Sequence, residues 1–291
     1  MKRLRLKSLL VLCLVACSFM SVSFNVKKAY AMPFYDLRPQ EMVLRSQFYT
    51  TYSTSSEERK HNIYLAAKSL NNVFVDVGAE FSFNKTVGKR TERRGYKKAK
   101  IIFNGQFIDG VGGGVCQVST TLYNAVLVGG LEITEFHPHS LAVNYVAPSF
   151  DAMVNSGSAD LRFINNTYNP IIIKTKADGD RLVIQIYGER LEEEIVRESV
   201  VVGEIEAPKE RVLKDEKGEY PTLYKGEYKF LSYSKNGIKS EGYIIRKRKG
   251  KTVSKKKIRQ DKYSALQGVV IEGTAERPTQ ENLEPIVESA I

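Results

Sequence analysis

Three consecutive glycines, Gly112 to Gly114, lead into Cys116 and then into a stretch with helical periodicity. The spacing of the apolar residues that follow predicts a helix with one buried face, ending near Gly129 and Gly130. These apolar residues are Val115, Val118, Leu122, Ala125 and Val126. Because glycine lacks a Cβ atom, the backbone before the helix can adopt positive φ values and let another group approach closely. The sequence therefore predicts Cys116 at the N-terminal end of a helix, behind a tight turn.

A cysteine in that position can act as a nucleophile, because the helix dipole and the unpaired N–H groups stabilise a thiolate. The turn formed by Gly113 and Gly114 also offers N–H groups for an oxyanion hole. The alternative is a small buried side chain, since free cysteine is among the most buried residue types.

Residues 1–31 have the pattern of an export signal. A basic start precedes the apolar run from Leu9 to Val22, and Ala29-Tyr30-Ala31 forms a small-residue cleavage site. Cleavage after Ala31 and a retained anchor both fit this pattern, and a lipoprotein box ending at Cys17 is a weaker alternative. We therefore expect an exported protein, in the cell wall or on the outer face of the cytoplasmic membrane, with membrane contact only through an uncleaved anchor.

Composition narrows the expected partners and chemistry. The first 31 residues hold six basic and no acidic residues, so removing them lowers the formal net charge from +11 to +5. The remaining charge is moderate, and the sequence has no array of alternating basic and aromatic residues. Both features argue against nucleic acid as a partner. Removal of the first 31 residues leaves one cysteine of three, so Cys116 is buried, reactive or paired with another chain. The three histidines and one cysteine have no metal-binding spacing, so we expect no metal and no cofactor.

Residues 32–188 predict an α+β domain, a mixed sheet with the cysteine-bearing helix. A capping box, Thr54 to Glu57, predicts a helix to about Asn71, and a strand follows over Val73 to Val77. A hairpin is expected around Asn104-Gly105, and an alternating extended stretch over 131–146. Further strands are expected at 161–164, 170–175 and 181–187. The basic stretch from Arg90 to Lys100 favours a solvated face over a carboxylate clamp.

Residues 189–274 predict a small all-β module after a charged connector over 189–198. Short alternating runs are separated by turns at Asn236-Gly237 and Lys249-Gly250. The module is rich in Lys, Arg and Tyr, which suits adhesion to an anionic or glycan surface, although a solvated sheet edge protected by lysines is the favoured explanation. The composition of residues 275–291 predicts a disordered tail.

A thiol nucleophile needs a base that exchanges protons near neutral pH, and histidine is suited to this role. His139, beyond the cysteine helix, is the first candidate, and His137 is the second. On a strand these two residues would point the same way, since they are two apart. Asp151 or a backbone carbonyl would orient the imidazole. Both histidines are also compatible with a strand edge that has no catalytic role.

The motif around the cysteine resembles the VanW-like domain of Gram-positive bacteria. The resemblance covers about residues 45–188 and rests on the whole of Gly112–Asn124 with several shorter matches. These are Phe81-Ser82-Phe83-Asn84, Gly88, Gly95-Tyr96, His139-Ser140, Tyr145, Asp151-Ala152 and Asp160-Leu161. The segment at about 195–274 is similar to a G-five domain, a proposed glycan-adhesion module, through scattered glycines and its end at Ile271–Thr274.

The resemblance implies cell-wall chemistry, because VanW-like domains are associated with glycopeptide-resistance loci and linked to peptidoglycan L,D-transpeptidation. Cys116 would then attack the carbonyl between the third and fourth residues of a tetrapeptide stem, and His139 would carry the proton. The Ser-His-Gly-Cys run of YkuD-type L,D-transpeptidases is absent from the sequence. The acyl group would pass to a neighbouring stem or to water, as in a transpeptidase or a carboxypeptidase.

The resemblance also implies a substrate site, although it assigns no individual roles. The candidate substrate-binding residues are Gly113, Gly114, Gln117, Ser119, Thr120, Ser140 and Tyr145. Thr120 is equally compatible with capping or packing. The competing functions are a non-catalytic peptidoglycan-binding or scaffold protein, with stem peptides or wall glycan as partners, and an envelope-assembly factor that binds a protein. A reactive Cys116 close to His139 would favour the enzyme over both of these competing functions.

Overall fold

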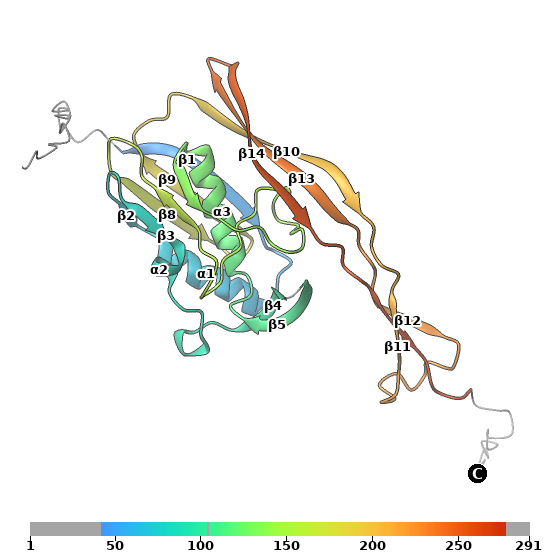
Figure 1. Ribbon diagram of the computed structural model, residues 1–291. Helices are drawn as coiled ribbons and strands as arrows, with labels where there is room; N and C mark the ends of the chain where they lie inside the picture. The colour runs from blue at the N-terminus through green and yellow to red at the C-terminus, as the bar shows by residue number, and fades with distance from the viewer. Residues whose placement is uncertain (1–41, 104, 278–291) are drawn as a thin grey trace, which may run out of the picture. The chain divides into compact units, whose positions relative to one another are not determined.

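The computed structural model describes residues 42–103 and 105–277 (Figure 1). The predicted export signal, Asn104 and most of the predicted tail lie outside these residues. The described chain is mostly β, with several sheets and a few helices rather than one large mixed sheet. None of the helices in these ranges is long and apolar enough to cross a membrane.

A four-stranded antiparallel sheet forms the base of the first part of the chain, in the order β1-β9-β8-β2. Its strands are β1 (Val43–Thr51), β9 (Arg181–Gly188), β8 (Ile171–Ala177) and β2 (Val73–Val75). Alternate residues of β9, namely Leu182, Ile184 and Ile186, are fully buried. Helices α1 (Glu57–Leu70) and α3 (Val115–Val128) cover this apolar face (Figure 1).

The N-cap of helix α1 lies two residues after Thr54, the N-cap of the predicted capping box. Ser56 is the N-cap, and its side chain accepts a hydrogen bond from the Arg59 N–H at 3.4 Å. Glu57 and Glu58 in the first turn favour the positive end of the helix dipole. The helix ends at Leu70, with Asn71 as the C-cap, close to the predicted end.

A smaller antiparallel sheet, in the order β3-β7-β6, lies beside helix α2 (Phe83–Val87). Its strands are β3 (Glu80–Ser82), β7 (Arg162–Ile164) and β6 (Glu132–Glu135). A short 3-10 helix (Glu92–Arg94) leads to the hairpin of β4 (Lys98–Phe103) and β5 (Gln106–Val111), where the sequence predicts one.

The predicted extended stretch over 131–146 is strand only in β6, and most of the chain between β6 and β7 is irregular. Side chains of α3 satisfy part of the backbone of this segment, which therefore needs no neighbouring strand. Asn124 Nδ2 donates to the Phe150 carbonyl at 2.8 Å, and the Ala152 N–H donates to Thr120 Oγ1 at 2.9 Å. His137 and His139 therefore do not share a strand face, which corrects the prediction.

After Gly188 the described chain contains strands and no helices. One antiparallel sheet has the order β10-β13-β14, from β10 (Glu194–Ile205), β13 (Gly237–Arg248) and β14 (Lys251–Tyr263). Another has the order β11-β15-β12, from β11 (Arg211–Lys214), β15 (Val269–Glu272) and β12 (Tyr228–Ser232). Strand β13 is longer than the short run predicted at 242–245, β14 was not predicted, and β10 begins inside the predicted charged connector.

Candidate active site

The glycine turn fixes the start of α3. Gly114 is the N-cap and has a φ of 106°, a left-handed conformation that favours glycine. A Cβ atom on Gly113 would lie 2.7 Å from the Lys100 carbonyl oxygen and 2.8 Å from the Ala99 carbonyl. The carbonyl of Gly113 also accepts a hydrogen bond from Asn62 Nδ2 at 3.0 Å. The absence of side chains thus lets β4 and α1 approach the backbone just before the cysteine.

Cys116 is the second residue of α3 and is partly exposed. Its Sγ donates to the Val154 carbonyl at 3.3 Å. Burial raises the pKa of this thiol, but the hydrogen bond and positive charge of His139, with the charge of Arg90, outweigh burial and lower the pKa below 9.0. Cys116 therefore combines partial exposure of the residue with a thiol of lowered pKa.

His139 is buried and is held by Asp151 through two hydrogen bonds to one oxygen. Its Nδ1 lies 2.6 Å from Asp151 Oδ2, and its backbone N–H donates to the same oxygen at 2.7 Å. Burial lowers the pKa of His139, but its hydrogen bonds to Asp151 and Cys116 outweigh burial and raise the pKa to about 9. Because Asp151 occupies Nδ1, the other ring nitrogen, Nε2, is the one left for the thiol.

Asp151 is 1% exposed, and its remaining oxygen is held by strand β14. Oδ1 accepts hydrogen bonds from Tyr263 OH at 2.5 Å and Arg259 Nη2 at 3.3 Å. Arg259 Nη1 also donates to the Asp151 backbone carbonyl at 2.5 Å. Burial raises the pKa of Asp151, but His139, Arg259 and Tyr263 outweigh burial and lower it. The carboxylate is therefore ionised and fixed on both sides.

Gln117, Ser119 and Thr120, three of the candidate substrate-binding residues, are buried along α3. Each is at most 1% exposed. Gln117 Nε2 donates to Thr50 Oγ1 at 2.9 Å, and Ser119 Oγ donates to the Ala152 carbonyl at 2.5 Å. Their polar atoms bond to protein groups, so these three residues hold α3 against β1 and the segment after Asp151.

Tyr145 lies near the thiol. Ser140 instead contacts Ser264 through its backbone. Tyr145 is half-buried, and burial, followed by the negative charges of Cys116 and Asp151, raises the pKa of its hydroxyl well above 10.0. Thr120 hydrogen-bonds to that hydroxyl. Ser140 is exposed, and its carbonyl accepts a hydrogen bond from the Ser264 N–H at 2.7 Å.

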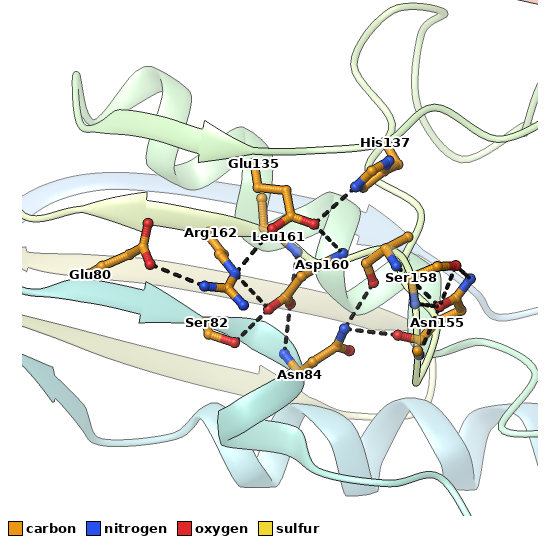
Figure 2. A network of polar contacts seen from close by, with 12 residues as sticks. Glu80, Ser82, Asn84, Glu135, His137, Asn155, Ser158, Asp160, Leu161 and Arg162 are labelled. Carbon is orange, nitrogen blue, oxygen red and sulfur yellow. Dashed lines mark hydrogen bonds and ion pairs between the residues drawn. The ribbon is translucent and has the colours of Figure 1, made fainter.

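His137, the second candidate base, pairs with a carboxylate outside this cluster. Its Nε2 lies 3.0 Å from Glu135 Oε1, in the network around Asp160 that Figure 2 shows. Asp160 accepts hydrogen bonds from Ser82 Oγ at 2.5 Å and the Asn84 N–H at 2.8 Å, so it caps α2. The structure therefore brings together Cys116, His139 and Asp151, and it assigns His137 to a different network.

Three residues that contact the Cys116, His139 and Asp151 cluster are absent from the candidates that the sequence offers. Arg90 contributes a positive charge beside Cys116, although the basic stretch that it begins was expected to be a solvated face. Arg259 and Tyr263 come from β14, more than a hundred residues after Asp151. Their alternation with Asp261 along one strand is the only sequence signal, and it does not distinguish buried from exposed positions.

The described residues offer no group of three His, Cys, Asp or Glu side chains that could hold a metal ion. Two pockets in this part of the chain lie away from the thiol. One lies between Phe107, Leu141 and Leu266, and the other between Leu65 and Tyr96. What the cluster can do chemically is exchange a proton between a partly exposed thiol and an imidazole held by a carboxylate.

Two solved G5 domains match part of this chain. "Crystal structure of HP0197-G5" is 17% identical with a TM-score of 0.16, covering 28% of this chain and 100% of that chain. "IgA1 Protease G5 domain structure" is 18% identical with a TM-score of 0.18, covering 31% of this chain and 100% of that chain. These TM-scores are too low to support an argument about the fold.

Residues 58–187, which include Cys116, His139 and Asp151, match the family model described as "VanW like protein". "Uncharacterized protein YoaR" of Bacillus subtilis (strain 168) is 45% identical over 141 residues, 48% of this chain and 46% of that protein. "Vancomycin B-type resistance protein VanW" of Enterococcus faecalis (strain ATCC 700802 / V583) is 28% identical over 140 residues, 46% of this chain and 50% of that protein. The chain spans about half the length of these curated relatives. The similarity to the VanW-like family is thus confined to residues 58–187 of this chain.

Proposed function

We propose that this protein is an exported cell-wall cysteine acyltransferase that acts on tetrapeptide stems of peptidoglycan, in the manner of an L,D-transpeptidase. One observation carries the proposal: the pKa of a partly exposed cysteine is lowered chiefly by His139, whose imidazole a buried carboxylate holds at 2.6 Å. Nucleophile, base and orienting group are the parts that acyl transfer by a cysteine requires.

In the acylation step the thiolate of Cys116 attacks the carbonyl between the third and fourth stem residues. A C–S bond forms, and the carbonyl electron pair moves onto oxygen. The tetrahedral intermediate collapses as the C–N bond breaks, and the imidazolium of His139 gives its proton to the departing amine of D-alanine. The N–H groups of Val115 and Gln117 donate to the Gly112 and Gly114 carbonyls at 3.1 and 3.0 Å, so the Cys116 N–H is the group at the start of α3 that we assign to the oxyanion.

In the transfer step the amine of the third residue of a neighbouring stem attacks the thioester. His139 takes a proton from this amine, the C–S bond breaks, and the thiolate of Cys116 is restored. One amide bond is exchanged for another, so the cycle needs neither a redox partner nor a cofactor. If water replaces the amine, the product is a shortened stem, and the protein acts as an L,D-carboxypeptidase.

The expected export and the family support the cell-wall substrate. The basic and apolar pattern of residues 1–31 supports a location in the wall or on the outer face of the cytoplasmic membrane. A relative carries the name of a vancomycin resistance protein, and vancomycin resistance concerns the cell wall. A wall peptide is therefore the substrate class we assign to the site.

A second candidate function, binding of wall glycan, rests on the aromatic residues near β12. Phe230 is 49% exposed and Tyr233 is 71% exposed, and their rings stack with centroids 5.0 Å apart. Exposed aromatic faces that carry a polar group are common at binding surfaces. This would make the protein a non-catalytic peptidoglycan or glycan-binding scaffold if the thiol proves inert.

The test is mass spectrometry of muropeptides after incubation of the protein with tetrapeptide-stem peptidoglycan, beside Cys116→Ala and His139→Ala. The proposal expects direct cross-links between third residues, which are absent with Cys116→Ala and strongly reduced with His139→Ala. Shortened stems without cross-links would indicate the carboxypeptidase. Unchanged muropeptides, with Cys116→Ala still sedimenting with the wall, would overturn the proposed enzymatic function and favour the non-catalytic scaffold.

A further inference from the structure

Arg90 is a cation beside the thiol whose hydrogen-bonding groups the protein does not fully use. Its Nη1 donates to the Gly88 carbonyl at 3.2 Å. Its Nη2 is buried and has no hydrogen-bond partner within the described residues. The guanidinium carbon lies 5.8 Å from the centre of the Phe83 ring. Because a guanidinium keeps its charge and a buried N–H without an acceptor is unfavourable, this group is suited to an anionic ligand.

The glycine turn brings Arg90 close to the nucleophile. A Cβ atom on Gly112 would lie only 3.0 Å from the Cβ of Arg90, so a larger residue there would push the arginine away. The positive charge of Arg90 contributes to the lowered pKa of Cys116. Arg59 also lies near the thiol, but its guanidinium donates to Gln117 Oε1 and Ser55 Oγ, each at 2.7 Å. Arg90 is thus the arginine with a free donor.

A second unused polar atom lies in the same region. Asn84 Oδ1 is buried without a hydrogen-bond partner, while Asn84 Nδ2 donates to the Asn155 carbonyl at 2.8 Å. Asn155 follows Val154, whose carbonyl accepts the hydrogen bond from Cys116. Asn84 follows Phe83, the ring that Arg90 covers. A ligand with both an anionic group and an N–H group would satisfy both unused atoms.

We propose that Arg90 forms a carboxylate-binding site beside Cys116, and that this site takes the C-terminal carboxylate of the acyl donor, with Asn84 accepting an N–H of the same peptide. The carboxylate is named on the basis of the proposed acyl transfer, because the leaving residue of a tetrapeptide stem carries it next to the scissile bond. A guanidinium can bind a carboxylate through two parallel hydrogen bonds, which fixes the position of the peptide end.

The anion site is testable without any peptidoglycan chemistry. Iodoacetate carries a carboxylate and iodoacetamide does not, and both alkylate the same thiolate. The ratio of their rates at Cys116, read at that residue by peptide mass spectrometry at one pH, removes the effect of the thiol pKa. We expect Arg90→Gln to lower the iodoacetate-to-iodoacetamide ratio roughly tenfold, the size of one charge-assisted hydrogen bond. Arg90→Lys should retain part of the preference. Lys89→Gln, which removes an exposed neighbouring charge, should leave the ratio unchanged.

An unchanged ratio in folded Arg90→Gln would overturn the anion site, whatever the protein does to muropeptides. A changed ratio in a protein that leaves muropeptides intact would retain the anion site and remove the proposed acyl transfer. To identify the ligand, acyl-donor peptides with a free and an amidated C-terminus are compared as competitors of alkylation. The free acid should protect Cys116 in the wild type and lose that advantage in Arg90→Gln. Equal protection by both peptides in the wild type would overturn the assignment of the donor carboxylate.

A separate observation concerns Arg259 and Tyr263, which lie outside the segment that matches the VanW family model. Both are at most 5% exposed, and both bond to Asp151 Oδ1, the oxygen that does not face His139. Arg259 Nε also donates to Asp261 Oδ2 at 2.9 Å, so this guanidinium is itself held in place. The Ser149 N–H donates to Tyr263 OH at 2.8 Å, which orients that hydroxyl toward the carboxylate.

We infer that Arg259 and Tyr263 are positioning residues that act through Asp151. The β10-β13-β14 sheet then helps to hold the Cys116, His139 and Asp151 cluster, in addition to belonging to a candidate adhesion module. Tyr263→Phe removes one hydrogen bond and retains the ring. We expect it to raise the pH midpoint of Cys116 alkylation by iodoacetamide, because the carboxylate then holds His139 less firmly. Lys256→Gln on the same strand is exposed and should not move the midpoint.

The decisive measurement is the same substitution in an Asp151→Asn background, as a double-mutant cycle. If Tyr263 acts through Asp151, Tyr263→Phe should change the midpoint little once the carboxylate is gone. Equal shifts in both backgrounds, or no shift in either, would overturn the inference. Arg259→Lys, which retains the charge, provides a second variant if Tyr263→Phe does not fold, and the same comparison applies to it.

Discussion

Asp151 Oδ2 accepts hydrogen bonds from both the Nδ1 and the backbone N–H of His139, at 2.6 and 2.7 Å. The two bonds fix the imidazole relative to its own backbone, so the ring cannot rotate freely. They also determine the tautomer, because a carboxylate accepts and Nδ1 must therefore carry the proton. In the neutral ring Nε2 is then the basic nitrogen, on the side of the ring that the thiol occupies.

Asp151→Asn should separate the charge of this residue from its shape. The amide fills the same space but no longer stabilises the imidazolium, so we expect the pKa of His139 to fall and that of Cys116 to rise. Acyl transfer should decrease by about 10² to 10⁴, the usual contribution of positioned acid–base catalysis. Alkylation of Cys116 by iodoacetamide against pH measures the change in the thiol. A midpoint equal to that of the wild type would contradict the role of Asp151.

The pH dependence follows from the opposite shifts of the two reacting groups. The pKa of Cys116 is lowered and that of His139 is raised to about 9, so thiolate and imidazolium coexist between the lowered pKa of the thiol and about pH 9. Activity should rise as the pH passes the lowered pKa of the thiol, and it should fall as the pH passes about 9, where His139 loses the proton that the leaving amine needs.

His139→Ala provides the control for this profile. The substitution removes the imidazolium, whereas the burial that raises the thiol pKa remains. The alkylation midpoint of Cys116 should therefore rise, and the descending limb near pH 9 should disappear from the rate profile. A midpoint that stays low in His139→Ala would assign the acidity of the thiol to another group.

Local signals in the sequence were sufficient to predict the helix and the place of Cys116 at its start. Three glycines and an apolar period locate the start of α3 close to Cys116, and the helix ends at Val128, just before Gly129, as predicted. The conformation of a turn depends mainly on residues close in the sequence, so a short stretch of sequence is enough to predict where α3 begins. His139, which Ser140 follows, is the first candidate base from the sequence and His137 the second, and the structure brings His139 near the thiol.

The rest could not be read locally, because it depends on contacts between distant segments. The stretch over 131–146 alternates like a strand, but Thr120 and Asn124 of α3 bond to the backbone that follows it. Arg259 and Tyr263 alternate with exposed residues on β14, a pattern that is the same for a solvated face and for one that packs on Asp151. From the sequence, these residues therefore belong only to the small all-β module over 189–274, with no sign that they contact Asp151.

Gly113 should tolerate no side chain. A Cβ atom there would lie 2.7 Å from the Lys100 carbonyl oxygen, and backbone atoms cannot move aside as a flexible side chain does. We expect Gly113→Ala to lower the free energy of unfolding by about 1–3 kcal/mol, the usual range for overpacking. Gly157→Ala is the matched control, since nothing lies within 4 Å of its Cβ position. Urea unfolding of both variants measures the difference, and equal stabilities would refute the close approach.

Gly242 on β13 should couple the second part of the chain to the site. A Cβ atom there would lie 2.9 Å from the Ser149 carbonyl oxygen, and Ser149 is two residues before Asp151. Gly242→Ala should therefore push the sheet away from this segment. We expect a loss of about 1–3 kcal/mol in the free energy of unfolding. Because Tyr263 would move with the sheet, the alkylation midpoint of Cys116 should also rise.

Gly203→Ala is the matched control for Gly242→Ala. Gly203 lies on β10 of the same sheet, and a Cβ atom there would meet only the Lys239 side chain, at an ordinary contact distance of 3.7 Å. It should change neither the unfolding free energy by more than about 0.5 kcal/mol, as for other surface substitutions, nor the midpoint. If Gly242→Ala destabilises the protein but leaves the Cys116 midpoint where it is in Gly203→Ala, the sheet contributes stability alone. A rise confined to Gly242→Ala would mean that docking of this sheet sets the acidity of the thiol, since the substitution touches neither Cys116 nor His139.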